Sequence, residues 1–593
     1  MNPRPIGPAW RGRPAWRILD TAFDDGSTFL TTWHRWQGDP QRPRMLHYVA
    51  LCDAPCSAQN LQRVAVSQPH LAKLAHTLSK RWFGLLPGFH RFLLEDGQVV
   101  LTLCVGERLS LLRAQQFEAD AVELALPACE PAQLPWLIKA LARCCRRGTA
   151  LSLRQMDGID QPALRMALKQ SGFTVSPQVA PSEPTAQEPL RGYFDPPWVL
   201  KNTRHDTPTT ALALGRCAVI GAGLAGASVA AALARRGWQV QVLDQAATPA
   251  TGASGLPVGL VVPHVSSDDC ALSKLSRAGV RLMLQQAGDL LQAGEDWAPS
   301  GVLERQIGGT PQQPPHWPLA GQAWFNPVDE AHTTPALDVG IWHHQGAWIK
   351  PAALVKAWLQ QPGVQFQAHA KVADLRQEDG IWALLDNADQ VLSRANCVVF
   401  ANARGAFELL HKLKHTTQHL KGLEAYLPNT QGMLGLLNWS QHHPLANEDF
   451  SVFPVNGSGS MIPGIPIEGG KAWFMGSSYQ PDTQPERSDL ANQAINFAHL
   501  QQLLPGLAQQ LASRFASKEL KHWKGTRCVT QDRLPAVGPL SREAHPSLWL
   551  CAGMGSRGLS FSVLCAELLA ARLCGEPWPI EAKLARLLDA LRG

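Results

Sequence analysis

Three glycines, Gly221, Gly223 and Gly226, form the pattern in this chain with the clearest chemical meaning. They stand between an apolar run, Cys217–Ile220, and an alanine-rich segment that continues to Arg236. The first glycine of such a pattern allows a tight turn, the second lets backbone approach a pyrophosphate, and the third lets a helix pack closely on a strand. The pattern predicts a strand, a phosphate-binding turn and a helix whose N-terminus faces the phosphates.

An acidic residue follows at the spacing that dinucleotide binding requires. A second apolar run, Trp238–Leu243, ends in Asp244, roughly 20 residues after the glycines, where a carboxylate can accept the ribose hydroxyls. The glycines alone would also fit a tight turn without a ligand. The complete strand–helix–strand order with its terminal acid favours the dinucleotide interpretation.

Two further segments carry small residues that can lie against a flat ring. Residues 252–269 include Ser254 and Gly255, and they also fit a plain surface turn. Residues 548–576 indicate a strand, a turn with Gly553, Gly555, Ser556 and Gly558, and a long helix. N–H groups at such a helix start can stabilise the negative charge of a reduced flavin.

Arg527 lies upstream of that turn, in the segment GTRCVTQDRLPAVG. A guanidinium is a permanent cation whose paired N–H groups match a carboxylate, so Arg527 is a candidate for binding an acidic substrate. The alternative is a surface salt bridge.

Size and composition limit the class of protein. The 593 residues are too many for one hydrophobic core and suggest about three to four folding units. No apolar run approaches a bilayer span and the N-terminal residues are rich in proline and arginine, which favours a cytoplasmic protein without a membrane. The 13 cysteines lack zinc-site spacing, so we predict no metal site. A net charge of +6 is compatible with a nucleic-acid partner, with short basic clusters at 143–147 and 521–527.

Proline density predicts where the chain divides. We expect a linker over residues 177–212, an N-terminal domain over 1–176 and a second domain over 213–593. Within the second domain, residues from about 285 to 480 alternate short β-like runs with loops, which indicates an antiparallel substrate subdomain. The segment CVVFANARG, residues 397–405, indicates a strand that returns to the parallel sheet. The predicted fold class is α/β.

The N-terminal domain begins like a methyltransferase but lacks its glycine-rich loop. Residues 16–33 predict a strand, a turn and a helix, yet Gly26 is the only glycine of the turn and follows Asp24 and Asp25. Carboxylates there would repel the carboxylate of a methionine group, and side chains block the close approach that glycine permits. We interpret this half as a degenerate Rossmann-like methyltransferase domain.

The chain resembles the MnmC family, bifunctional enzymes that modify the wobble uridine of tRNA. The segments that carry the resemblance are CAVIGAGLAGASVAAALARRGWQVQVLDQAATPATGASG, HHQGAWIKPAALV, GSSYQPD, GTRCVTQDRLPAVG and GMGSRGL. The resemblance is strong after residue 210 and weak before it. The FAD half of this family is a flavoprotein of the glycine-oxidase and D-amino-acid-oxidase type.

The resemblance implies two reactions on tRNA. The FAD domain would oxidise 5-carboxymethylaminomethyl-(2-thio)uridine to 5-aminomethyl-(2-thio)uridine and release glyoxylate. The N-terminal domain would then methylate the amine with S-adenosylmethionine, which gives 5-methylaminomethyl-2-thiouridine.

The resemblance also assigns roles to individual residues and names no acid or base. Gly221, Gly223, Gly226 and Asp244 would hold the ADP part of FAD. Arg527 and Tyr479 would shape the site for the substrate carboxylate. The remaining small residues would lie near the flavin: Ser254, Gly255, Gly553, Gly555, Ser556 and Gly558.

The N-terminal half departs from the family at each methyl-donor motif. The glycine-rich loop is replaced by residues 22–26, and an Asp-Gly pair is replaced by Ala125 and Leu126, ahead of 127–129. The acid expected after the second strand is displaced, with Cys52 and Asp53 in its neighbourhood. These departures weigh against S-adenosylmethionine binding.

Two other functions stay open at this point. A flavin oxidase of a free small amino acid, such as glycine or sarcosine, would turn over without RNA. A catalytically silent module that binds RNA or a protein partner would purify without flavin.

Overall fold

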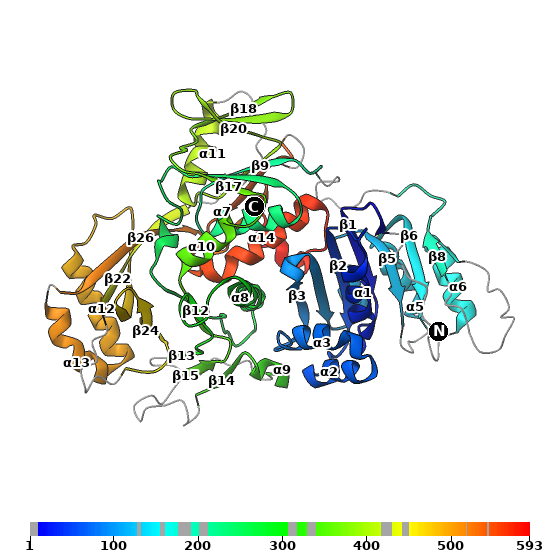
Figure 1. Ribbon diagram of the computed structural model, residues 1–593, viewed down its shortest axis with the longest axis horizontal. Helices are drawn as coiled ribbons and strands as arrows, with labels where there is room; N and C mark the ends of the chain where they lie inside the picture. The colour runs from blue at the N-terminus through cyan, green and yellow to red at the C-terminus, as the bar shows by residue number, and fades with distance from the viewer. Residues whose placement is uncertain are drawn as a thin grey trace. The chain divides into compact units, whose positions relative to one another are not determined.

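The computed structural model describes most of the chain (Figure 1). The described residues are 10–126, 132–154, 160–175, 191–200, 212–305, 317–328, 340–416, 430–441, 450–517, 519–541 and 545–592. They form two compact units. Unit 1 comprises residues 1–213 with 570–585, and unit 2 comprises residues 214–569 with 586–593.

Unit 1 is built on an eight-stranded sheet in the order β3-β4-β2-β1-β5-β6-β8-β7. Strands β4, β2, β1, β5 and β6 run parallel, whereas β3 and β8 are antiparallel to their neighbours β4 and β6. The strands are β1 (Ala15–Asp20), β2 (Met45–Cys52), β3 (Gly88–Leu94), β4 (Val99–Val105), β5 (Ala119–Leu124), β6 (Cys145–Leu153), β7 (Phe173–Val175) and β8 (Arg191–Phe194).

Helices cover both faces of this sheet, which explains why β2, β4 and β5 are buried along their whole length. The first three helices contribute to one hydrophobic cluster and the next three to another. They are α1 (Ser27–Gly38), α2 (Ala58–Ser67) and α3 (Ala72–Ser79), then α4 (Arg108–Arg113), α5 (Leu134–Ala142) and α6 (Gln161–Gln170).

The boundaries of unit 1 differ from the predicted ones in two places. Residues 191–194, inside the predicted linker, form β8, which pairs with β6 and β7. Gly192 allows this pairing, because a Cβ there would lie 2.4 Å from the carbonyl oxygen of Thr174. Residues 570–585, predicted to belong to the second domain, cluster with unit 1, where the Ala582 N–H donates to the Ala114 carbonyl (3.3 Å). Proline density does not reveal either long-range contact.

Unit 2 contains a six-stranded sheet in the order β17-β10-β9-β21-β28-β27. All neighbouring pairs are parallel except β27 with β28. The strands are β9 (Arg216–Ile220), β10 (Gln239–Leu243), β17 (Val364–Gln367), β21 (Cys397–Phe400), β27 (Ala536–Pro539) and β28 (Leu548–Ala552). Helix α7 (Leu224–Arg235) links β9 to β10, and residues 224–234 are all buried because alanine and glycine permit close approach.

A second sheet of unit 2 has the order β14-β15-β13-β23-β24-β25-β22-β26 and is largely antiparallel. It extends to residue 530, beyond the predicted limit near 480, because β26 pairs with β22 at its edge. The strands are β13 (Val302–Arg305), β14 (Phe325–Pro327), β15 (Gly340–His343), β22 (Thr430–Gln441), β23 (Val455–Gly457), β24 (Gly459–Ile467), β25 (Gly470–Pro481) and β26 (Lys521–Thr530).

Smaller elements complete the chain. Two three-stranded sheets consist of β11 (Gly259–Val261), β16 (Ala347–Ile349) and β12 (Trp297–Ala298), and of β18 (Asp374–Glu378), β19 (Ile381–Leu385) and β20 (Val391–Ala395). The other helices are α8 (Ala271–Leu290), α9 (Leu319–Gln322), α10 (Pro351–Leu359), α11 (Arg404–Thr416), α12 (Asp489–Leu503), α13 (Pro505–Ala516), α14 (Gly558–Cys574) and α15 (Ala582–Arg586). Among the described residues, no helix has the length and apolarity to cross a bilayer.

Candidate functional site

A large cavity of unit 2 opens at the carboxyl ends of β9, β10 and β21. Its volume is about 1500 Å³, which exceeds the roughly 300–1,000 Å³ of an ordinary small-ligand pocket. Its lining includes the glycine turn after β9, Asp244, most of residues 250–265 but not Gly255, parts of strands β24 to β26 and the turn before α14. The cavity therefore has room for a dinucleotide together with a second group.

The turn after β9 is shaped so that only glycine fits. Gly221 has a φ of +106°, and a Cβ there would lie 2.7 Å from the Asn402 Cα. A Cβ on Gly226 would lie 1.9 Å from the Gly221 carbonyl oxygen, so helix α7 packs directly on the turn. These contacts give the first and third glycines the roles that the sequence predicts.

Gly223 and Leu224, in the remaining part of the turn, contact the short 3-10 helix at Ala253–Gly255. A Cβ on Gly223 would lie 2.9 Å from the Ser254 Oγ. That Oγ accepts a hydrogen bond from the Leu224 N–H (2.9 Å), at the first turn of α7. Gly255 is held close to the Ala250 carbonyl oxygen, 2.6 Å from where its Cβ would be. Ser254 thus lies at the positive end of α7 and lines the cavity.

Asp244 lies at the end of β10 and lines the same cavity. Its two carboxylate oxygens accept hydrogen bonds from the Ala222 N–H (2.7 Å) and the Ala246 N–H (2.9 Å). The carboxylate therefore joins the glycine turn to the loop after β10. Its contact with a ribose stays a prediction.

The second glycine turn lines the same cavity, although it lies more than 300 residues further along the chain. Gly553 and Gly555 have positive φ angles of 76° and 57°, and a Cβ on Gly553 would lie 2.6 Å from the Thr530 Cγ2. Gly558 begins helix α14, and Ser556 lines the cavity with all three glycines. The N-terminus of α14 is thus brought to the cavity that contains the first glycine turn.

Arg527 and Tyr479 are neighbours in this cavity although 48 residues separate them. They lie on β26 and β25, the two strands that flank β22. An Arg527 Nη1 donates a hydrogen bond to the Tyr479 hydroxyl, and the guanidinium carbon lies 4.9 Å from the centre of the ring. No ion pair joins Arg527 to a carboxylate of the described residues, and its binding of a substrate carboxylate stays a prediction.

Charged or titratable residues that the sequence analysis did not single out also line the cavity, among them His264, Glu304 and Arg557. Glu304 on β13 accepts a hydrogen bond from the fully buried His343 (2.8 Å) on the neighbouring strand. The His264 Nδ1 lies 3.0 Å from the Ser273 Oγ of α8. Arg557 lies within the second glycine turn, so the sequence pattern of that turn could have indicated it. No local pattern indicates Glu304, because its contact with His343 forms only when β13 pairs with β15.

These groups influence each other's titration. Burial raises the pKa of Glu304, but the hydrogen bond and charge of His343, with the charges of His264 and Arg557, outweigh it and leave the pKa lowered. Burial, followed by the charge of Arg557, lowers the pKa of His264. At neutral pH the cavity therefore presents an anionic Glu304 and a neutral His264 beside cationic arginines.

FAD fits this cavity by the shape of the chain itself. The backbone at Gly221, Gly223 and Gly226 leaves a cradle that any Cβ would fill, and Asp244 ends the next strand. The α14 turn supplies N–H groups and Arg557 a cation on another wall. Bound FAD would supply two-electron oxidation. The fold and this cavity define a flavin-dependent oxidoreductase.

Comparisons with known proteins support this class and give the family. The family model for FAD dependent oxidoreductase matches residues 216–572. The tRNA 5-methylaminomethyl-2-thiouridine biosynthesis bifunctional protein MnmC of Albidiferax ferrireducens is 52% identical over 99% of this chain and 94% of its own length. The protein of the same name from Polaromonas naphthalenivorans is 44% identical over 98% of this chain and 90% of its own. The chain belongs to the MnmC family.

The solved structure of glycine oxidase from Geobacillus kaustophilus shares the fold of unit 2. It has a TM-score of 0.50 and 18% identity, and the match covers 64% of this chain and 99% of that one. The predicted combination of a parallel FAD-binding sheet with an antiparallel subdomain is confirmed.

The predicted methyl-donor positions of unit 1 lie at the ends of β1, β2 and β5. Residues 22–26 follow β1, Asp53 follows β2, and Ala125 and Leu126 follow β5, whereas 127–129 lie outside the described residues. Asp24 is a non-glycine residue with a φ of 52°. The turn therefore keeps a backbone that favours glycine but presents carboxylate side chains.

Proposed function

We propose that this chain is a tRNA-modifying oxidase that removes the carboxymethyl group from 5-carboxymethylaminomethyl-(2-thio)uridine. The secondary amine would lose two electrons and two protons to bound FAD, which gives an imine. Water would then split the imine into 5-aminomethyl-(2-thio)uridine and glyoxylate. Dioxygen or another electron acceptor would reoxidise the flavin. As an enzyme of tRNA we expect it in the cytoplasm.

One observation carries the proposal: Arg527 and Tyr479 lie together in the cavity that holds the FAD-binding turns. An arginine binds a carboxylate in a fixed orientation through its paired N–H groups. The Tyr479 ring limits where the guanidinium of Arg527 can lie. A carboxymethylamine held at its carboxylate presents its C–N bond at a fixed place. Orientation of this kind is the main contribution that a protein makes to flavin oxidation of an amine.

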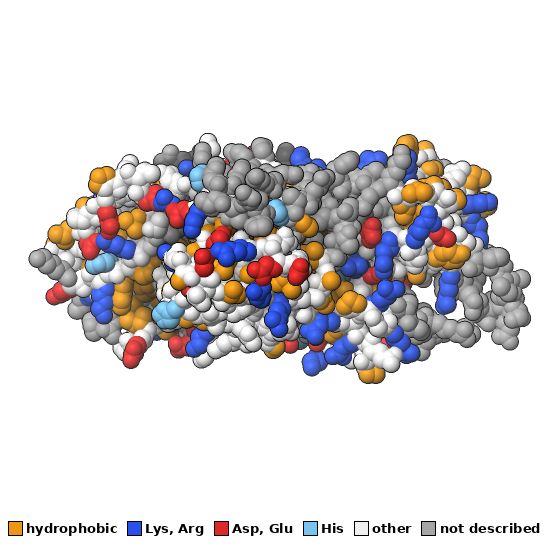
Figure 2. Space-filling view, turned by 90° about the horizontal axis from the view of Figure 1, so that it is seen from above, with side chains coloured by type: hydrophobic (Ala, Val, Ile, Leu, Met, Phe, Trp, Pro, Cys, Tyr) orange, Lys and Arg blue, Asp and Glu red, His pale blue; other side chains and the backbone are white. Residues whose placement is uncertain are grey.

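The relatives support tRNA as the carrier of this amine, since the proteins that match nearly the whole chain are named for tRNA 2-thiouridine biosynthesis. Basic side chains spread over the visible face and mix with acidic ones in Figure 2. Residues of both predicted basic clusters form ion pairs: Arg146 with Asp120, Arg147 with Asp195, and Lys524 with Glu486 (2.6 Å). Electrostatic attraction to RNA would therefore come from many dispersed cations.

An oxidase of a free small amino acid is the second candidate, favoured by the glycine-oxidase fold of unit 2. Both candidates use the same cavity and differ in what the carboxymethylamine is attached to.

The test is an analysis of nucleosides after the purified yellow protein is incubated with tRNA bearing 5-carboxymethylaminomethyl-2-thiouridine. We expect conversion to the aminomethyl nucleoside with one glyoxylate per nucleoside. The matched reaction contains glycine or sarcosine in place of tRNA. Turnover of the free amino acid without conversion of the nucleoside would overturn the proposal, and a protein without flavin would favour the silent module.

A further inference from the structure

A reversal of strand order in the sheet of unit 1 marks the place where a nucleotide-binding crevice is expected. The order runs from β1 through β2 to β4 on one side and through β5 to β6 on the other. In open parallel sheets, ligands bind at such a reversal, beyond the carboxyl ends of the strands. Asp20 ends β1, Leu124 ends β5, and Arg154 directly follows β6. A methyl donor bound by a Rossmann-like domain would need this place.

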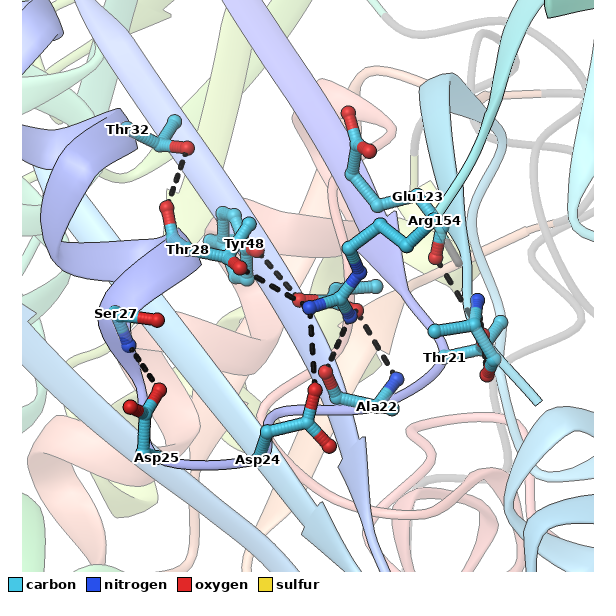
Figure 3. Close-up of polar contacts among 12 residues, drawn as sticks. Thr21, Ala22, Asp24, Asp25, Ser27, Thr28, Thr32, Tyr48, Glu123 and Arg154 are labelled. Carbon is cyan, nitrogen blue, oxygen red and sulfur yellow. Dashed lines mark hydrogen bonds and ion pairs between the residues drawn. The ribbon is translucent and has the colours of Figure 1, made fainter. Parts of the chain in front are cut away.

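Arg154 extends from the end of β6 to the end of β1, as Figure 3 shows. One Nη atom contacts the carboxylate of Asp20 and the carbonyl oxygen of Ala22. The other Nη donates to the Thr28 Oγ1 (3.0 Å) and forms an ion pair with Asp24 (3.2 Å). The guanidinium thus joins the turn after β1 to the first turn of α1.

Asp20 also accepts hydrogen bonds from groups other than Arg154. It is buried, its Oδ1 accepts from the Ala22 N–H (3.0 Å), and its Oδ2 accepts from the Tyr48 hydroxyl (2.6 Å). Both oxygens of Asp20 therefore already accept hydrogen bonds, and the Arg154 guanidinium offsets the carboxylate charge.

The N-terminus of α1 is occupied by the chain's own carboxylate. The Asp25 Oδ1 accepts from the Ser27 N–H (2.9 Å), the first amide of the helix. A helix N-terminus binds a ligand anion through such amides. With Asp25 on this amide and Asp24 beside it, the carboxylate of a methionine group would meet negative charge instead of donors.

A second arginine, Arg108, contacts the residues that follow β1 and β2. Arg108 of α4 donates from Nε to the Thr21 carbonyl (3.1 Å) and from Nη1 to Asp53 (2.5 Å). Thr21 and Ala125, at the ends of β1 and β5, are tied by two hydrogen bonds through the Thr21 Oγ1 (2.6 and 2.8 Å). Asp53, which directly follows β2, is thus held by Arg108.

We propose that the nucleotide-binding crevice of unit 1 is closed by its own side chains, Arg154 and Arg108 with their carboxylate partners, and that this chain does not bind S-adenosylmethionine. If the proposed function holds, the primary amine is the last product that this chain makes. A methyl-transfer reaction with a donor site on another protein must then supply any methyl group. The described residues do not fit the donor, so no methylation step is assigned to unit 1.

The direct test is calorimetric titration of the full flavin-loaded chain with S-adenosylmethionine and with S-adenosylhomocysteine. We expect no saturable heat up to about 1 mM, a concentration at which a site with a Kd of about 1 mM would be half filled. Stoichiometric binding of either compound with a micromolar Kd would overturn the proposal. This result does not depend on the oxidase reaction.

Hydrogen–deuterium exchange locates any binding on the same protein. Exchange of residues 21–28 should be unchanged by S-adenosylmethionine. As an internal control, FAD added to flavin-depleted protein should slow exchange over residues 221–228 at least several-fold. Slower exchange over residues 21–28 with the methyl donor would overturn the proposal even if the heat of binding were small.

Product analysis separates this proposal from the proposed function. With modified tRNA and S-adenosylmethionine together, the aminomethyl nucleoside should accumulate to the same level as without the donor. Appearance of the methylaminomethyl nucleoside would refute the closed crevice while supporting the oxidase. If no aminomethyl nucleoside forms, the proposed oxidase fails, and the binding and exchange measurements still decide the state of the crevice.

Discussion

At the scale of single residues, the first glycine turn shows how the absence of a side chain creates a binding site. Gly226 lets α7 lie so close to Gly221 that a Cβ would be 1.9 Å from its carbonyl oxygen. Backbone and not side chains then faces the place where a pyrophosphate would be. Both the packing of α7 and the cofactor contact depend on Gly226 having a hydrogen atom in place of a Cβ.

Replacing Gly226 by valine should therefore remove FAD from the purified protein. The new side chain forces α7 away from the turn, and we expect the flavin absorbance per chain to fall roughly tenfold or more. Gly506→Ala is the matched control, because a Cβ at Gly506 meets nothing within 4 Å. Full flavin content in Gly226→Val would contradict the assigned role of the turn.

Arg527 should control recognition of the substrate carboxylate. Arg527→Met removes a charge-assisted contact of about 1.5–3 kcal/mol, so kcat/KM for the modified tRNA should fall roughly 10- to 150-fold. Tyr479→Phe, which removes only the hydroxyl that accepts from Arg527, should cost roughly fivefold. Arg376→Met, on β18 and paired with Asp389, is the control for an Arg-to-Met change outside the cavity. Equal rates for Arg527→Met and Arg376→Met would exclude the carboxylate role.

Asp20 predicts a pH dependence of stability in unit 1. Burial raises its pKa to about 6, against the opposing effects of Arg154 and the Tyr48 hydrogen bond. The folded chain thus keeps a proton that the unfolded chain loses, so this group makes the protein less stable as pH rises from about 4 to about 6. Asp20→Asn abolishes the titration.

The comparison of Asp20→Asn with the parent chain tests this sign. Relative to the parent, the variant should gain on the order of 2 kcal/mol in free energy of unfolding between pH 4 and pH 7. Urea unfolding at several pH values measures the difference. A difference that does not change with pH would mean that Asp20 does not titrate in this range.

At the scale of elements, packing of helix on helix places the second glycine turn. Gly279 of α8 contacts the first turn of α14, and a Cβ there would lie 1.8 Å from the Ser560 carbonyl oxygen. The sequence analysis did not single out Gly279, because an isolated glycine in a helix carries no signal until its neighbour is known.

Gly279→Ala should displace the start of α14 and destabilise unit 2. We expect a loss of about 1–3 kcal/mol from overpacking, together with weaker flavin binding, since α14 begins at the cavity. Gly288→Ala on the same helix is the control, because its Cβ would meet Trp297 at an ordinary 3.6 Å. Thermal unfolding and flavin release measure both effects, and identical behaviour of the two variants would refute the role of Gly279.

At the scale of the whole molecule, dispersed cations distinguish a tRNA substrate from a free amine. Cations line the cavity, and others are spread over the surface among acidic residues. Binding of a polyanion releases counterions, whereas binding of a small amino acid does not.

Salt should therefore weaken the reaction with tRNA far more than a reaction with a free amino acid. For about three phosphate contacts, raising the salt concentration from 50 to 200 mM should increase KM for tRNA roughly 20- to 40-fold. The KM for sarcosine, where measurable, should change less than twofold. If KM for tRNA and KM for sarcosine depended equally on salt, the enzyme would not bind the phosphates of the tRNA.

The sequence alone determined the FAD-binding half, because its signals are local. The order of strand, glycine turn, helix, strand and acid from Cys217 to Asp244 lies within one supersecondary unit, and the structure has those elements within a residue or two. The second glycine turn was visible for the same reason. Short-range spacing sets both the backbone conformation and the direction of the helix N-terminus.

Only the tertiary structure decided which distant residues meet. It brings Tyr479 to Arg527 through β22, places Glu304 beside His343, and adds β8 and residues 570–585 to unit 1. The sequence showed that the turn after β1 had lost its glycines, but the contact of Arg154 with the end of β1 depends on β6 lying two strands from β1 in the sheet. Strand order in a sheet follows from long-range packing, which no local pattern encodes.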